Sequence, residues 1–336
     1  MGFFDFLLPK PEDLTLHVCM MGPRAVGKTT VLTSIFHETQ QSICGTRLYL
    51  RAEDSNTSKL ITYRAELQEA VERQDPGRLP ASNTISRFVF GLGLKGQKPT
   101  VNIAVQDYPG EFLTSSDKAK RKEVDDFVSA ASIILIAIDT PYLMEEEGKW
   151  NEQKNKIEVV SSYLMQHGAL VQHKLVLFVP LKCERYFHDG CIVEVSERIK
   201  ACYADLISFF DQNEIASLIT PILTLGGMEF DHMEQRTLAF GDISQIACYR
   251  PYAKNPVYQP MFCPQPLYHL LSYTANYYDW MNRQPKGFMD RLRTSIYSYL
   301  MNDEEFAEEV RSISSYTIWD KDGFVPLTTN NIYKLN

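Results

Sequence analysis

The sequence predicts an α/β fold in three layers, in which helices cover both faces of a mostly parallel sheet that has one antiparallel edge strand. Apolar runs of strand length alternate along the chain with segments whose apolar residues recur at helical spacing. The run over residues 133–138 is continuously apolar, which is typical of a strand covered on both sides. Helices are therefore expected on both faces of the sheet.

The expected elements follow one another in an order that fits such a sheet. Residues 95–98 separate two strand-like runs and contain Gly96, so they predict a hairpin that adds the antiparallel strand. Strands are expected over residues 14–21, 85–94, 100–107, 133–139, 174–179 and 215–225. Helices are expected over residues 28–37, 55–74, 117–131, 150–166, 193–210, 266–282 and 287–301.

The chain of 336 residues is long enough for one large domain with insertions. We expect an N-terminal apolar segment over 1–11, the α/β domain over 12–282 and a helical extension over 283–336. Within the domain, the helix near 55–75 is expected to be an insertion. Residues 226–265 mix polar residues with Gly and Pro without a clear period, and they predict an insertion loop.

Charge and composition limit the partners and the location. The formal net charge of −8 gives no overall positive field, so nucleic acid is not expected as a partner. Seven cysteines without Cys-x-x-Cys spacing disfavour a disulfide framework and favour the cytoplasm. No apolar run reaches the roughly 18 residues of a membrane span. The apolar start, with Phe3, Phe4 and Phe6, is expected to cover a core edge or a partner rather than to anchor the chain in a membrane.

The first expected strand leads into a phosphate-binding motif that opens the first expected helix. The segment Gly22-Pro23-Arg24-Ala25-Val26-Gly27-Lys28-Thr29 matches G-x-x-x-x-G-K-[ST], the P-loop. Its glycines let backbone N–H groups surround a phosphate, and the helix N-terminus adds partial positive charge. We expect Lys28 to neutralise the β- and γ-phosphates and Thr29 to give its hydroxyl to Mg²⁺. The residues expected to hold the nucleotide here are Gly22, Arg24, Ala25, Val26, Gly27, Lys28, Thr29 and Thr30.

A second motif, Asp107-Tyr108-Pro109-Gly110, follows the strand expected over 100–107. A D-x-x-G segment at a strand end downstream of a P-loop predicts that Asp107 holds Mg²⁺ through a water. The N–H of Gly110 is expected to sense the γ-phosphate, so that this loop changes conformation on hydrolysis. The alternative is an ordinary Pro-Gly turn.

These two motifs, followed by Lys182-Cys183-Glu184, appear in the order and strand positions of the Ras-like (TRAFAC-class) P-loop GTPase superfamily, which the sequence resembles. The chain is similar to divergent prokaryotic members of the double-GTPase group. The resemblance covers about residues 12–282. It implies the P-loop NTPase fold, with GTP or GDP and Mg²⁺ as cofactors.

The resemblance also assigns residues to the base. The family reads guanine with Asn/Thr-Lys-x-Asp, and Lys182 matches the Lys whose stem covers the base and ribose. Glu184 replaces the Asp that accepts from guanine N1 and N2, and Leu181 stands in place of Asn. Leu225 lies where the family makes backbone contacts to the base. The alternatives are a solvated pair of Lys182 and Glu184, and a plain loop at Leu225.

Two further loop positions follow from the resemblance. The family presents a Thr to Mg²⁺ before its second strand, and Thr84 is the first candidate, with Ser82 second. An ordinary turn residue is the alternative. The helix over 55–74 then precedes this loop as a lid or a partner surface.

Two departures from the family bear on catalysis. Glu111 stands where the family often has the Gln that orients the attacking water, and a carboxylate cannot donate to the transition state. Arg24 either reaches the γ-phosphate or obstructs the water, and we favour obstruction or exposure to solvent. The expected catalytic set is Lys28, Glu111 and Arg24.

The sequence thus predicts a Mg²⁺-dependent GTPase that acts as a molecular switch, with slow intrinsic hydrolysis stimulated by a protein partner. In the GTP state its ordered loops would bind a protein effector. The alternatives are an ATPase or P-loop kinase with the same phosphate site, and a scaffold that holds nucleotide without hydrolysing it.

Overall fold

The computed structural model of the chain describes residues 14–23, 25–74, 86–107, 118–237, 243–283, 300–330 and 332–333. At its centre is an eight-stranded sheet with the order β10-β7-β6-β5-β1-β4-β3-β2. Strands β4, β1, β5, β6 and β7 pair in parallel, whereas β2–β3, β3–β4 and β10–β7 pair antiparallel. The strands are β1 (Thr15–Met21), β2 (Leu48–Ala52), β3 (Ser86–Leu94), β4 (Val101–Asp107), β5 (Ala131–Asp139), β6 (Leu175–Leu181), β7 (Ala216–Ile219) and β10 (Val325–Thr328).

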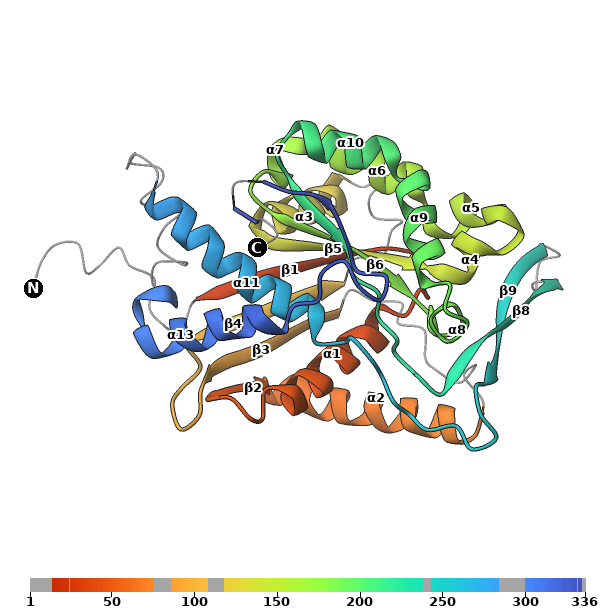
Figure 1. Cartoon of the computed structure of the whole chain (residues 1–336), viewed down its shortest axis with the longest axis horizontal. Helices are drawn as coiled ribbons and strands as arrows, with labels where there is room; N and C mark the ends of the chain where they lie inside the picture. The colour runs from red at the N-terminus through yellow and green to blue at the C-terminus, as the bar shows by residue number, and fades with distance from the viewer. Residues whose placement is uncertain are drawn as a thin grey trace, which may run out of the picture.

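Helices cover both faces of the sheet (Figure 1). One face packs against α1 (Lys28–Ser42), α2 (Asp54–Glu72), α11 (Gln265–Asn282) and α13 (Glu304–Ile313). The other face packs mainly against α3 (Lys118–Ala130), α6 (Ile157–Gln166), α9 (Ile192–Cys202) and α10 (Ala204–Gln212). Shorter helices are α4 (Thr140–Met144), α5 (Asn151–Asn155), α7 (Gly168–Val171) and α8 (Glu184–His188). The predicted α/β class, with a mostly parallel sheet between two helical layers, is confirmed.

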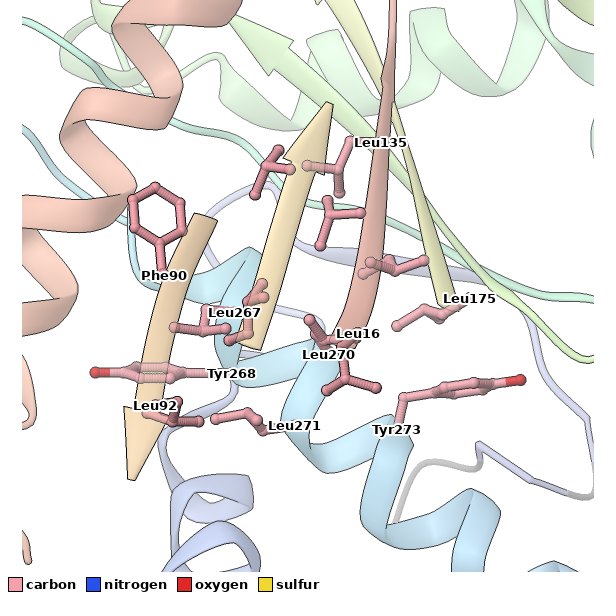
Figure 2. Packing of buried hydrophobic residues seen from close by; sticks show 14 of the residues in the cluster. Leu16, Phe90, Leu92, Leu135, Leu175, Leu267, Tyr268, Leu270, Leu271 and Tyr273 are labelled. Carbon is pink, nitrogen blue, oxygen red and sulfur yellow. The ribbon is translucent and has the colours of Figure 1, made fainter. Parts of the chain in front are cut away.

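The central strands explain why the sequence shows continuous apolar runs there. Along β5, Ile133 and Leu135 belong to the core on one face, and Ile134 and Ile136 to the core on the other. Successive side chains of a strand point to opposite faces, so a strand covered on both sides needs an apolar residue at every position. Figure 2 shows the first of these cores, where Leu267, Tyr268, Leu270, Leu271 and Tyr273 of α11 lie against Leu16, Phe90, Leu92, Leu135 and Leu175 of the sheet.

Both edges of the sheet carry a strand that the sequence did not predict. β2 pairs outside β3, so the antiparallel strand expected from the hairpin is one position in from the edge. Its five residues alternate, with Leu48, Leu50 and Ala52 buried and Arg51 exposed. An alternation this short is too weak a signal to set a strand apart from a loop. β10 is shorter still and contains Pro326, which edge strands tolerate.

Residues 226–265 are not the irregular loop that the sequence predicted. They contain an antiparallel two-stranded ribbon, β8 (Met228–Thr237) and β9 (Ile243–Pro251). We call β8 and β9 the ribbon; in Figure 1 it stands beside α8, beyond the end of the sheet. The distal residues of β8 are exposed on both faces, so polar side chains occupy successive positions and no apolar period marks the strand.

Two predicted helices are divided in the structure. The helix expected over 150–166 is interrupted at Lys156, whose φ of 56° lies in the left-handed region, so α5 and α6 are separate. The helix expected over 193–210 is interrupted at Tyr203 and divides into α9 and α10. The helix expected over 287–301 lies mostly outside the described residues. Among those that are described, no helix combines the length and apolar character that a bilayer span requires.

His269 joins α11 to the C-terminal segment. Its side chain is completely buried, its Nδ1 lies 2.8 Å from the hydroxyl of Tyr333, and its ring meets Trp319 edge to face at 5.0 Å. Burial lowers the pKa of His269 from 6.5 to about 3, because the charged imidazolium would lose its hydration. The residue is therefore neutral in the folded chain across the physiological range of pH.

We expect this burial to make the fold sensitive to acid. Below pH 6.5 the unfolded chain takes up a proton at His269 that the folded chain excludes down to about pH 3. The contribution of neutral His269 to the free energy of unfolding is complete above pH 6.5, and about 2 kcal/mol of stability is lost by pH 5. Urea unfolding measures the free energy of unfolding at pH 7 and at pH 5. Between the two it should fall less for His269→Gln, which retains an acceptor for Tyr333, than for the unmodified chain. An equal loss in both chains would contradict this prediction.

Candidate functional site

Four neighbouring strands end at the same edge of the sheet and bring the motif residues together. Met20 of β1 is in register with Asp107 of β4, and Asp139 of β5 is in register with Leu181 of β6. The P-loop begins directly after β1, and Lys182 directly after β6. In parallel α/β sheets ligands bind at this carboxyl edge, where the strand order diverges.

The P-loop leaves β1 through a close backbone contact. A Cβ atom at Gly22 would lie 2.9 Å from both the Cβ and the carbonyl oxygen of Ala137 in β5. Ala25 (φ 61°) and Gly27 (φ 109°) adopt left-handed conformations, and Gly27 precedes the first residue of α1. The loop therefore depends on glycine for its approach to β5 and for the turn into the helix.

Lys28 lies inside this loop. Its side chain is only 7% exposed, and its ammonium donates to the carbonyl oxygens of Gly22 at 3.0 Å and Pro23 at 2.8 Å. Thr29 follows in the first turn of α1, where its carbonyl accepts from Thr33. The structure thus places a desolvated cation at the start of a helix, in the arrangement that binds phosphate elsewhere.

Lys182 connects the loop after β6 to the P-loop. Its backbone is left-handed, with φ 59°, and its ammonium donates to Asp139 Oδ2 at 2.6 Å and to the carbonyl of Ala25 at 3.3 Å. Asp139 is completely buried, so this ion pair neutralises a carboxylate that water does not reach. The ends of β5 and β6 and the P-loop are therefore held together by one side chain.

Asp139 is a site residue that the sequence analysis did not identify. Its backbone N–H donates to Asn155 Oδ1 at 2.8 Å, and Asn155 is held in turn by Asn151. One carboxylate oxygen, Oδ2, receives the Lys182 ammonium, while Oδ1 has no hydrogen-bond partner among the described residues. The available signal was its place: it is the charged residue at the end of a continuous apolar strand, where the site of an α/β protein lies.

Lys154 of α5 was missed as well. Burial lowers its pKa, and the positive charges of Lys182 and Lys28 lower it further, whereas Asp139 opposes the shift. Two lysines and one buried carboxylate therefore act on Lys154, in a chain with net charge −8. A group of lysines at this edge fits a polyphosphate.

Glu184 does not form the solvated pair with Lys182 that was the alternative interpretation. It is 2% exposed, and its Oε1 accepts from the N–H of Leu225 at 3.0 Å. Burial raises the pKa of the carboxyl, and the N–H groups of Leu225, Glu184, Gly226 and Thr224 oppose the shift. The carboxylate thus ties the loop after β6 to the loop after β7, and the N–H of Leu225 is already used.

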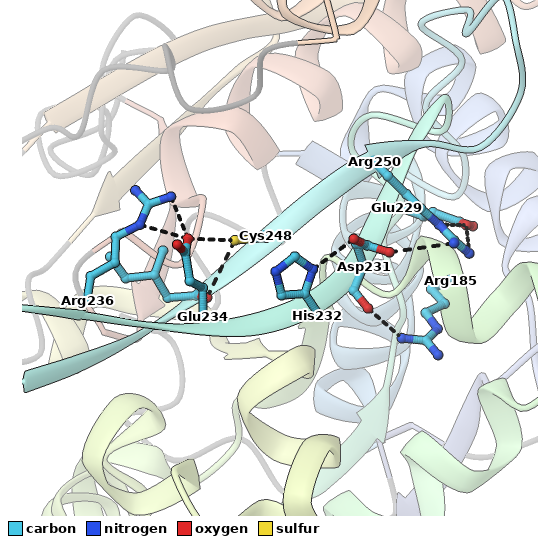
Figure 3. Close-up of polar contacts among 9 residues, drawn as sticks. Arg185, Glu229, Asp231, His232, Glu234, Arg236, Cys248 and Arg250 are labelled. Carbon is cyan, nitrogen blue, oxygen red and sulfur yellow. Dashed lines mark hydrogen bonds and ion pairs between the residues drawn. The ribbon is translucent and has the colours of Figure 1, made fainter.

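The ribbon packs beside these loops. Arg250 pairs with Glu229 at 3.0 Å, Glu229 also contacts His188 of α8 at 3.1 Å, and Arg185 donates to the carbonyl of Asp231. Figure 3 shows the contacts of Arg250 with Glu229 and of Arg185 with Asp231, in which Arg185 reaches from α8 to the ribbon. From β9, the ring of Tyr249 faces the Lys182 ammonium, with 6.0 Å between nitrogen and ring centroid.

The structure accounts for only part of the predicted site. It brings together Gly22, Ala25, Val26, Gly27, Lys28, Thr29 and Thr30 with Lys182, Glu184 and Leu225. The backbone of Asp107 lies beside β1, and its side chain is outside the described part of the chain. The predicted residues Arg24, Ser82, Thr84, Gly110 and Glu111 are also outside the described residues.

The fold and this loop define a P-loop protein of the α/β class. The profile of the family described as Double-GTPase 2 matches residues 17–218, well over half of the chain, and the chain belongs to this family. This confirms the predicted resemblance to Ras-like GTPases and to their double-GTPase group. A comparison with curated proteins gave no match.

Several solved structures are similar to this chain. The S. cerevisiae Ski7 GTPase-like domain bound to GTP is 13% identical, with 67% of this chain and 45% of that chain covered and a TM-score of 0.37. The same domain bound to GDP and inorganic phosphate is 15% identical, with 76% and 49% covered and a TM-score of 0.36. Sup35 complexed with GDP is 11% identical, with 67% and 40% covered and a TM-score of 0.27. The chain spans less than half the length of each.

The contact between Gly22 and Ala137 leads to a stability prediction. Gly22→Ala would force a methyl group to within 2.9 Å of β5, so we expect a loss of about 1–3 kcal/mol in the free energy of unfolding. Gly45→Ala is the control, because a Cβ there meets nothing within 4 Å. It should change the stability by less than about 0.5 kcal/mol. Urea unfolding of the two variants tests the difference, and equal midpoints would refute the close contact.

Proposed function

We propose that the chain binds a guanine nucleotide with Mg²⁺ at the carboxyl edge of the sheet and hydrolyses GTP slowly as a molecular switch. One observation carries the proposal: in a member of a GTPase family, the P-loop lysine is buried in its loop and Lys182 contacts the same loop. The phosphate-binding and base-binding motifs therefore form one continuous site. We place its nucleotide-binding elements within residues 12–282, with the ribbon as part of an insertion. β10 and α13 of the C-terminal segment belong to the same sheet and core.

The phosphate end of the site would be formed by the P-loop. The Lys28 ammonium now donates to two loop carbonyls, and phosphate oxygens would replace them as acceptors. The N–H groups at the start of α1 would add hydrogen bonds from residues 27–30. Mg²⁺, when bound, supplies charge neutralisation between the phosphates, and Thr29, Thr84 and Asp107 are the residues proposed to hold it.

The base end would be formed by the loops that follow β6 and β7. Lys182 would lie along the base and ribose, and Glu184 would accept from guanine while it keeps the N–H of Leu225. A carboxylate can accept at about four positions, so the bond to Leu225 leaves room for a second partner. Leu225 then acts by positioning Glu184 rather than by offering its own N–H.

Hydrolysis and switching are proposed to depend on loops outside the described residues. Glu111 would orient the attacking water without donating to the transition state, which fits slow turnover and stimulation by a protein partner. Arg24 would cover the γ-phosphate side of the P-loop. The GTP-bound conformation of the loops at 84 and 107–111 would bind a protein effector in the cytoplasm.

The hydrogen bond between Glu184 and the N–H of Leu225 also favours a second candidate function. If the bond to Leu225 occupies the carboxylate fully, the site holds a nucleoside triphosphate without reading its base, as in an ATPase or a P-loop kinase. A scaffold that holds nucleotide without cleaving it is the third candidate. Single-turnover hydrolysis of GTP and ATP, with and without cell extract, separates the scaffold from the two enzymes.

We expect Lys28→Ala to weaken the binding of GTP by roughly 100-fold or more, because the phosphates lose their buried cation. Isothermal titration with Mg²⁺ present measures the loss. Lys200→Ala is the control, because Lys200 pairs with Glu197 on the surface of α9, and it should bind GTP like the unmodified chain. Retained micromolar affinity in Lys28→Ala would exclude this site.

We expect the unmodified chain to prefer GTP to ATP, and Glu184→Gln to reduce that preference by roughly tenfold or more. The amide keeps an oxygen for the N–H of Leu225 but loses the charge that attracts the guanine donors. Competition titrations with GTP and ATP on both chains measure the ratio of affinities. Equal affinities in the unmodified chain would favour the second candidate instead.

A further inference from the structure

Two buried polar atoms near Lys182, at the base end of the proposed site, have no partner among the described residues. They are Asp139 Oδ1, at the end of β5, and the hydroxyl of Tyr249, in β9. Asp139 is completely buried, and burying an ionised oxygen without a donor costs free energy. Each atom would be satisfied by a ligand that enters beside Lys182.

Tyr249 and Asp139 both lie close to the Lys182 ammonium. The Lys182 ammonium contacts Asp139 Oδ2 at 2.6 Å and lies 6.0 Å from the centroid of the Tyr249 ring. Burial raises the pKa of Tyr249 well above its usual value, and among the charges the carboxylate of Asp139 contributes most. The phenol is therefore a neutral hydroxyl, able both to donate and to accept, near a carboxylate oxygen that can only accept.

The distance from Lys182 to the Tyr249 ring is close to that needed for a planar ligand. Contacting layers of carbon atoms lie about 3.5 Å apart, so a flat ring between the Lys182 side chain and Tyr249 needs about 7 Å. The ribbon would have to move outward by about 1 Å. The Tyr249 residue is partly exposed while its hydroxyl is buried, and its side chain packs against the apolar cluster of Leu67, Val71, Leu225 and Met228.

The ribbon holds Tyr249 in place through several contacts. Phe230 of β8 is opposite Tyr249 in the ladder and is completely buried. The hydroxyl of Tyr142, which follows β5, donates to the carbonyl of Gln245 at 2.7 Å. At the other end of β9, Tyr252 stacks on His188 with ring centroids 3.7 Å apart. Tyr249 is thus positioned by a docked strand, as a binding residue requires.

We propose that Tyr249 binds the nucleoside part of the nucleotide, with its ring on the base opposite Lys182. Its hydroxyl would donate to or accept from the nucleoside, and Asp139 Oδ1 would accept from it. The inference rests on the proposed function. A nucleoside has a planar face for the ring and N–H or O–H donors for the carboxylate oxygen. Inorganic polyphosphate has neither, so it gains nothing from Tyr249.

Three variants test the role of Tyr249 by titration with GTP and GDP and by competition with inorganic tripolyphosphate. Tyr249→Ala should weaken GTP and GDP by roughly 10- to 100-fold, the range for losing an aromatic partner of a base. Tyr249→Phe keeps the ring, and its affinity for GTP and GDP should fall only a few-fold. Tyr316→Ala removes a tyrosine that is 52% exposed, after α13 and outside the ribbon, and should bind all three ligands normally.

Tripolyphosphate distinguishes a specific loss of nucleoside binding from a general loss of the folded site. It should bind Tyr249→Ala as it binds the unmodified chain, because it uses only the P-loop. An equal loss for GTP and tripolyphosphate, a matching loss in Tyr316→Ala, or unchanged GTP affinity in Tyr249→Ala would each overturn the inference while leaving the proposed function intact. An unmodified chain that binds neither GTP nor tripolyphosphate would overturn both.

Discussion

The carboxyl edge of the sheet depends on how one buried carboxylate is neutralised. Asp139 is inaccessible to water, and an unpaired charge there would cost several kcal/mol. Lys182 provides the counter-charge and with the same ammonium reaches the carbonyl of Ala25. The P-loop has little conformational preference of its own, because Gly22 and Gly27 allow many backbone angles. Its placement beside β5 and β6 therefore follows from the charge requirement at Asp139 together with the tight contact at Ala137.

Lysine side chains gather at the same edge of the sheet. The charges of Asp139, Lys182 and Lys28 all act on Lys154, and the Lys28 ammonium donates to two loop carbonyls. Carbonyl dipoles satisfy an ammonium only in part, so a polyphosphate would gain from a cation that is already desolvated and in place. The predicted triphosphate site is thus consistent with the charges as well as with the motif.

The parts of the structure that the sequence predicted are those with a strong local signal. The continuous apolar runs of β5 and β6 and the P-loop pattern follow from burial on two faces and from backbone chemistry, and both can be read from consecutive residues. β2 and the ribbon carry no such signal, because five alternating residues or a strand exposed on both faces resemble a loop. Asp139, Lys154 and Tyr249 come from three separate elements, so only the folded chain shows that they lie around Lys182.

The motif proposed to bind the base, after β6, differs from that of the superfamily the chain resembles. The difference lies mainly in one residue, Glu184. Glu184 is longer by one methylene than the Asp of the family motif, and its carboxylate accepts from the backbone of the loop after β7. Once that carboxylate holds the loop, less of it remains for a base, and recognition needs other polar groups. The ribbon supplies Tyr249 at this place, and the end of β5 supplies Asp139. In the proposed site, the residues that read the nucleoside would thus come from the insertion after β7 and the end of β5 as well as from the motif after β6.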